Sequence, residues 1–253
     1  MTTGPDAPDP GAGQGFPRTR LSVLEALADA DEGVRRESFG TLVAAYWKPV
    51  YLHLRWRWNK SAQDAEDLTQ DFFALALERE FFTGYDPDQA RFRTFLRVCL
   101  DRFAAKAHRA ERRLKRGGGL VPLELDFAGA DRAFAAAGQV TEAEADQRFH
   151  QEWVRSLFTL AVDALAAECA GTPRAIRFEV FRRYDLLPTT GTDRPSYRQL
   201  GHELGVPETQ VTNHLAWARR EFRRHLLERL RLLSGSEAEF RAEARALLGV
   251  EPE

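Results

Sequence analysis

The chain has 253 residues, enough for one or two domains that each bury a core. Hydrophobic residues make up 43% of the chain and charged residues 29%, which excludes general disorder, and no apolar run approaches the roughly 18 residues of a membrane span. The net charge is −2, so any binding of nucleic acid must come from local basic patches.

Residues 1–19 are rich in proline and glycine and predict a disordered tail without the apolar stretch of a signal peptide. The two cysteines, Cys99 and Cys169, are far apart and have neither metal-ligand spacing nor the pattern of a disulfide framework. We therefore expect a reducing, cytoplasmic location, and no metal site or cofactor.

From Leu21 onward the apolar residues recur at the helical period, and strand-like alternation is absent from the sequence. The predicted fold class is all-α. The expected helices cover roughly 20–30, 35–58, 62–79, 90–114, 142–170, 173–186, 196–204, 208–233 and 236–248. Aromatic residues of the second of these helices recur at helical spacing and are expected mainly in the core: Tyr46, Trp47, Tyr51, Trp56 and Trp58.

The helix predicted at 62–79 has Ser61 as its N-cap and carries acidic side chains on one face. Asp64, Asp67 and Asp71 share that face, while apolar residues line another. Carboxylates in a first helical turn are stabilised by the helix dipole and need no partner, so this pattern alone leaves their role open.

The segment from Arg91 to Arg116 contains ten Lys and Arg residues against two acidic residues, a local charge of +8. Such an excess is typical either of a solvated helix face or of a surface that binds phosphates. It ends at Gly117–Gly119 and Pro122, which break the helical pattern, and no convincing period follows until about residue 141.

These breaks predict two helical domains joined by a flexible linker. The predicted plan is a disordered tail over 1–19, a first domain over 20–116, a linker over 117–141, a second domain over 142–233 and a helical extension over 234–253.

The second predicted domain contains a helix-turn-helix pattern. Gly201 is small where a second helix must cross closely, Gly205 can adopt the left-handed conformation that ends a helix, and Pro207 suits the start of the next helix. The second helix has one apolar stripe, formed by Val211, Leu215, Ala218, Phe222 and Leu226.

Opposite this stripe lie groups that can reach base edges and phosphates in a major groove. They belong to Thr209, Asn213, Ala216, Trp217, Arg220 and Arg224. An ordinary helical hairpin with a solvated polar face is the alternative, which the arginine-rich remainder of the helix makes less favourable.

Three motifs, in this order, make the chain resemble the extracytoplasmic-function sigma factors, small initiation subunits of bacterial RNA polymerase in the sigma-70 family. The motifs are Asp64–Phe73, then Phe92–Phe103 leading into His108–Arg113, then the helix-turn-helix with Ala216–Arg220 behind it. Together they cover about residues 35–231, most of the chain.

The resemblance implies two contacts for the first domain. The acidic helix would dock on the coiled-coil clamp of the polymerase β′ subunit through Asp64, Asp67, Gln70 and Asp71. The loop from Phe82 to Arg91 and the basic helix would hold the melted −10 element, with Arg91, Arg93, Arg97, Lys106, Arg109, Arg112 and Arg113 on the strand. Nearby aromatic residues would supply stacking platforms for bases.

The resemblance also implies that the second domain places its recognition helix on the duplex −35 element, beside the polymerase β flap. The residues at that interface would be Thr209, Gln210, Thr212, Asn213, Ala216, Trp217, Arg220 and Arg224. Trp217 stands where the family often has arginine, and Thr209, Gln210, Thr212 and His214 depart from its usual pattern, so the −35 sequence does not transfer to this chain.

The sequence thus indicates a binding protein rather than an enzyme, since no nucleotide-binding loop, zinc motif or nucleophile elbow is present in it. By resemblance, its regulator would be an anti-sigma factor or a kinase. The alternative function is that of a one-component helix-turn-helix regulator, which binds DNA without being a polymerase subunit.

Overall fold

A computed structural model describes residues 32–77, 81–82, 84–111, 125–138, 140–187 and 194–249. Throughout these ranges the regular structure is helical, as predicted, and no strand occurs. The elements are α2 (Glu32–Arg57), α3 (Ala62–Ala76), α4 (Phe92–Glu111), α5 (Phe127–Ala137), α6 (Glu142–Cys169), α7 (Ala175–Phe181), the π-helix η1 (Arg182–Leu186), α8 (Tyr197–Leu204), α9 (Glu208–Leu232) and α10 (Glu237–Leu248).

Helix starts follow the capping residues in the sequence. Ser61 Oγ accepts a hydrogen bond of 3.1 Å from the backbone N–H of Asp64, which confirms Ser61 as the N-cap of α3. Ser196 and Gln199 form a reciprocal capping box at the start of α8. The predicted tail and the predicted helix 20–30 lie outside the described residues.

The larger hydrophobic cluster is built around α2 and is rich in aromatic side chains. Tyr46, Tyr51 and Phe92 are fully buried in it. Trp47, Trp56 and Trp58 are partly buried against it, so the aromatic run of α2 packs in the core as predicted. The cluster draws on α2, α3, α4 and α5, on α6 as far as Ala161, on the C-terminal half of α9 and on α10.

The smaller cluster joins the C-terminal end of α6 to α7, α8 and the N-terminal half of α9. Its buried residues are Leu165, Cys169, Val180, Phe181, Leu200, Val211, Leu215 and Ala218. Phe222 of α9 packs beside both clusters, with its ring 5.5 Å from that of Phe158 and 5.7 Å from that of Phe181.

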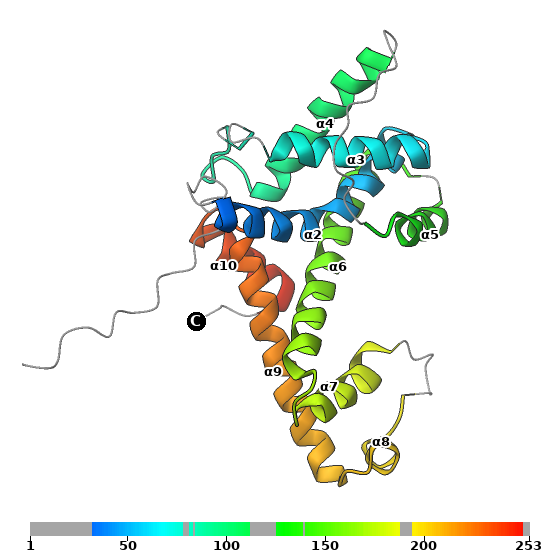
Figure 1. The fold of residues 1–253 in the computed structure, drawn as a ribbon, viewed down its shortest axis with the longest axis vertical. Helices are drawn as coiled ribbons and strands as arrows, with labels where there is room; N and C mark the ends of the chain where they lie inside the picture. The colour runs from blue at the N-terminus through cyan, green and yellow to red at the C-terminus, as the bar shows by residue number, and fades with distance from the viewer. Residues whose placement is uncertain are drawn as a thin grey trace, which may run out of the picture.

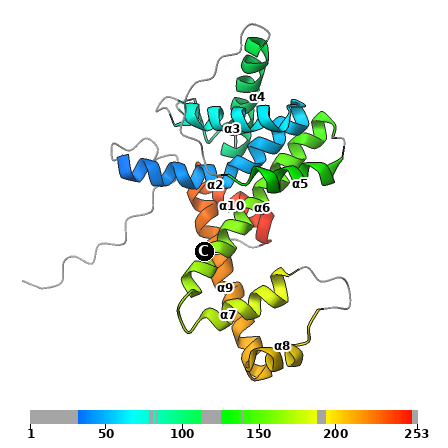
Figure 2. The same cartoon turned by 45° about the vertical axis from the view of Figure 1, so that its right-hand side comes forward.

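The two long helices α6 and α9 lie side by side and connect the two ends of an elongated molecule (Figures 1 and 2). Helices α2 to α5 and α10 gather at one end, and α7 and α8 lie at the other. None of the helices in the described ranges combines the length and the apolar character needed to cross a bilayer.

The predicted domain boundaries differ from this packing. The predicted linker contains α5, whose Phe127 ring packs on Tyr51 and whose Asp131 accepts hydrogen bonds from Tyr51 and Arg55. Parts of α6 and α9 and all of α10 contribute to the same cluster as α2. The reason is that α6 and α9 are long enough to reach both ends, which a reading of local breaks in the sequence does not reveal.

Candidate nucleic-acid interface

The helix-turn-helix forms as the sequence predicts. Gly205 ends α8 in the left-handed conformation with φ 67°, and the chain then turns through Val206 into α9. A Cβ atom at Gly201 would stand 2.6 Å from the Val206 carbonyl oxygen, so only glycine allows the turn to pack this closely.

The α9 stripe faces inward and leaves a polar face in solvent. Val211, Leu215 and Ala218 are buried against α7 and α8. The opposite face exposes Thr209, Gln210, Thr212, Asn213 and Ala216. This face carries hydroxyl and amide groups close to the N-terminus of a helix, an arrangement that suits base edges and phosphates.

Trp217 is half-buried, unlike the other predicted base-contacting residues at this end of α9. The guanidinium carbons of Arg174 and Arg177 lie 5.7 and 4.9 Å from its ring centroid. Burial, and secondarily the charge of Arg177, lower the pKa of His214 beside it. Sequence reasoning missed both arginines, which add positive charge next to the recognition helix.

Arg220 and Arg224 lie on the exposed side of α9, but each is paired with a carboxylate. Arg220 Nε lies 3.3 Å from Glu221. Arg224 lies 2.7 Å from Glu168, and its hydrogen bond to Glu221 is the main reason why its pKa is raised. A phosphate would therefore have to replace carboxylates at Arg224, whose Nε, Nη1 and Nη2 all contact one, whereas at Arg220 only Nε makes such a contact.

The N-terminal half of α4 is also ion-paired. Arg91 and Arg93 lie 2.8 and 3.1 Å from the same oxygen of Glu243 in α10. Arg97 lies 2.9 Å from Asp146 of α6. These predicted strand-binding residues therefore face acidic partners on other helices, and Arg97 also lies 3.2 Å from Asp101 of α4 itself.

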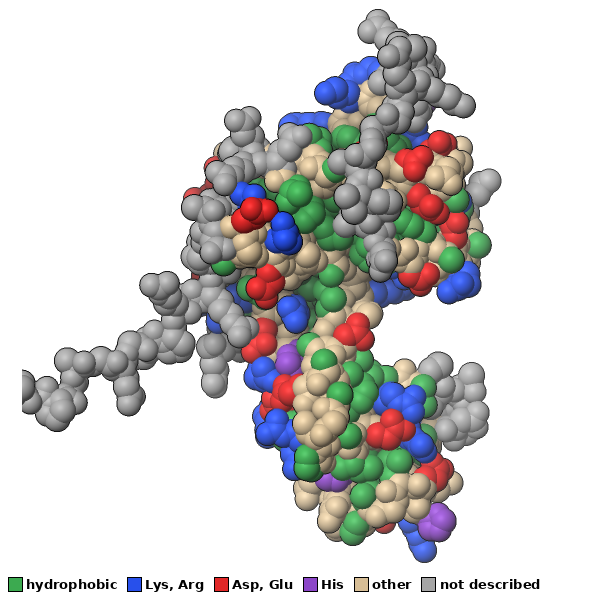
Figure 3. Space-filling view, viewed as in Figure 1, with side chains coloured by type: hydrophobic (Ala, Val, Ile, Leu, Met, Phe, Trp, Pro, Cys, Tyr) green, Lys and Arg blue, Asp and Glu red, His purple; other side chains and the backbone are tan. Residues whose placement is uncertain are grey.

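Toward its C-terminal end α4 projects from the molecule and is exposed, and Arg102, Lys106 and Arg109 lie there. Figure 3 shows basic side chains gathered at this projecting end. Arg112 and Arg113, also predicted to contact DNA, lie outside the described residues. The described part of the basic segment thus divides into a paired half and an exposed half.

The acidic row of α3 lies on the surface beside α4. Asp64, Asp67 and Asp71 are exposed, whereas Gln70 is half-buried. Partial burial, and then the neighbouring Asp67 carboxylate, raise the pKa of Asp71. Leu75 continues this row with an exposed apolar side chain, so the surface of α3 is both acidic and apolar.

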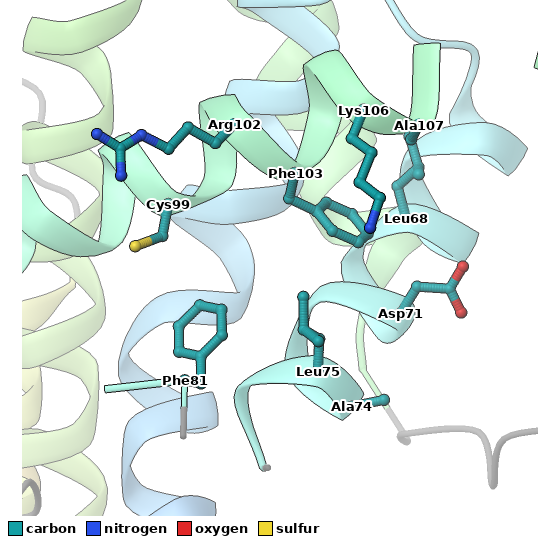
Figure 4. Close-up of a pocket in the computed structure, with 10 residues that line it drawn as sticks. All are labelled: Leu68, Asp71, Ala74, Leu75, Phe81, Cys99, Arg102, Phe103, Lys106 and Ala107. Carbon is teal, nitrogen blue, oxygen red and sulfur yellow. The ribbon is translucent and has the colours of Figure 1, made fainter. Parts of the chain in front are cut away.

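A pocket of about 730 Å³ lies between α3 and α4. Phe103 and Lys106 reach from α4 toward Leu75 of α3, while Arg102 extends away (Figure 4). Cys99 also lines the pocket, and burial raises the pKa of its thiol. Both cysteines are free thiols, and within the described ranges no three His, Cys, Asp or Glu side chains gather as metal ligands would.

Comparison of the chain with protein-family models, with curated proteins and with solved structures finds no match.

Proposed function

We propose that this protein is a sigma-type specificity subunit of bacterial RNA polymerase. In this proposal α9 reads the duplex −35 element, α4 holds the melted −10 strand, and α3 docks on the polymerase. The observation that carries the proposal is the placement of these three surfaces. The acidic row of α3 and the exposed basic part of α4 share one end of the molecule, and the helix-turn-helix lies at the other (Figure 1).

The acidic row favours a protein partner. Three exposed carboxylates on one helix, Asp64, Asp67 and Asp71, repel the DNA backbone, so they are unsuited to promoter contact. They suit a basic surface on a protein, and the apolar Leu75 and Leu77 beside them supply area that such a partner can bury. A DNA-binding protein with a separate acidic docking surface fits an initiation factor.

The experiment is run-off transcription with purified core polymerase. The templates are DNA molecules selected from a pool by their binding to the complex of this chain with core polymerase. The proposal predicts transcripts of defined length only when the chain is added, with start sites that follow two separated conserved elements. No promoter-specific transcript from any selected template, despite active core polymerase, would contradict it.

One observation favours a second candidate, the one-component regulator. The pocket between α3 and α4 is large enough for a small ligand, as a ligand-sensing regulator requires. Footprinting separates the two candidates. A one-component regulator protects its operator without polymerase, whereas the sigma-type subunit requires core polymerase for full protection of both elements.

A further inference from the structure

Two carboxylates of α10 lie on the N-terminal end of α4. Glu239 accepts hydrogen bonds from the Phe92 N–H at 2.8 Å, from the Tyr85 hydroxyl at 3.0 Å and from the Gly235 N–H at 2.8 Å. Phe92 is the first residue of α4, so Glu239 occupies the positively polarised end of that helix.

Glu243 lies one turn further along α10, on the same face, and pairs with Arg91, just before α4, and with Arg93 in the first turn of α4. One of its oxygens is 2.8 Å from Arg91 and 3.1 Å from Arg93, and its side chain is only 2% exposed. Together, the two carboxylates contact a helix N-terminal N–H group and guanidinium groups. Proteins use the same donors to bind the phosphate oxygens of nucleic acid.

The packing of α10 suggests a contact that can separate. Phe240 and Ala244 are its only fully buried apolar residues, and Leu247 and Leu248 at its C-terminal end are only partly buried. Three side-chain atoms around Glu243 are buried without a hydrogen-bond partner in the described part of the chain: Glu243 Oε2, Trp153 Nε1 and His150 Nδ1. Buried polar atoms left unpaired reduce the stability that an interface provides.

We propose that α10 competes internally with nucleic acid. In this proposal Glu239 and Glu243 occupy the positions on α4 that backbone phosphates of a single DNA strand take once α10 has moved away. The proposal rests on the proposed function, because it assigns this part of α4 to the melted strand. Tyr85 is held in the same contact through its hydroxyl, and its ring lies 5.2 Å from that of Phe95; both rings provide platforms on which unstacked bases would lie.

The test measures binding of a fluorescent single strand of about 12 nucleotides to the full chain by anisotropy, at several salt concentrations. The double variant Glu239→Gln, Glu243→Gln removes both charges. Ala244→Glu disrupts the apolar face of α10 and keeps both carboxylates. The matched control is Glu237→Gln, an exposed glutamate of the same helix that pairs with Arg231 and Arg241.

We expect both releasing variants to bind the strand at least about fivefold more tightly than the wild type, and the control to match the wild type. Freeing Arg91 and Arg93 adds two phosphate contacts, so the slope of log K against log salt should steepen by about 1.4. Hydrogen exchange in residues 237–248 reports whether α10 has been released, and in the wild-type protein the strand itself should accelerate this exchange.

Faster exchange in α10 with unchanged strand affinity and salt slope would overturn the proposal, as would a strand that leaves the exchange of wild-type α10 unaltered. Affinity for core polymerase is measured on the same variants, so that failure of the proposed function can be distinguished from failure of the proposed role of α10. A chain without that affinity contradicts the proposed function, whatever the α10 variants do with DNA.

Discussion

Gly201 and Gly205 set the geometry of the helix-turn-helix at the level of single atoms. Gly205 adopts a positive φ of 67°, at which a side chain is strained. Gly201 has a negative φ but stands against the Val206 carbonyl, so its constraint is one of space. The packing of α8 against the turn and the start of α9 depends on this close approach.

Substitution of Gly201 by alanine should therefore destabilise the protein by about 1–3 kcal/mol, because the added methyl group overlaps the turn. Gly40 provides the matched control. It lies in the exposed interior of α2 with open space around its Cβ position, so Gly40→Ala should stabilise by about 0.5–1 kcal/mol. Urea denaturation followed by circular dichroism measures both changes; equal effects of the two substitutions would contradict this account.

At the scale of elements, the sequence predicts those helices whose signals are local. Ser61, Ser196 and Gly205 mark helix ends, and the apolar stripe of α9 predicts its buried face correctly. Helix α5 was missed because the glycines before it suggested a linker. Its Phe127 and Phe134 nevertheless pack on the core around α2.

The pairing of charges could not be predicted in the same way. The positions of Arg91 and Arg93 in a basic run suggest a DNA-binding surface, but Glu243 is about 150 residues away in the sequence and only the tertiary fold brings it near. The same holds for Arg224 and Glu168, which belong to different helices. Helical periodicity shows on which face of its helix a residue lies. It does not show which residue, distant in the sequence, packs against that face.

Helix α9 also allows a direct test of its role. Asn213 is exposed on its outward face, so Asn213→Ala should leave folding intact and remove about 1–3 kcal/mol of discrimination at one base position. The measurement is selection from a promoter library by the complex with polymerase. Thr159→Ala, an exposed position on α6, is the control and should keep the wild-type preference. An unaltered −35 preference for Asn213→Ala would remove this residue from the interface.

At the scale of the whole molecule, α6 and α9 contribute to both hydrophobic clusters and so connect the two ends. Phe222 packs between Phe158 and Phe181 where the two clusters meet. This arrangement keeps α10, and with it Glu239 and Glu243, close to α4. If α10 competes with a DNA strand for α4, as proposed above, binding of the strand must break the contacts of Glu239 and Glu243.

The proposed docking of the acidic row of α3 on core polymerase is tested most directly by the affinity of the purified chain for that enzyme. Asp67 is exposed, and its one hydrogen bond in the described structure comes from Gln63, so Asp67→Arg reverses the docking charge without disturbing the core. Asp163→Arg makes the same charge reversal at an exposed position on α6. We predict tight binding by the wild type and by Asp163→Arg, and at least about tenfold weaker binding by Asp67→Arg, which corresponds to about 1.4 kcal/mol. No measurable affinity of the wild type, or equal affinity of the two variants, would contradict the account.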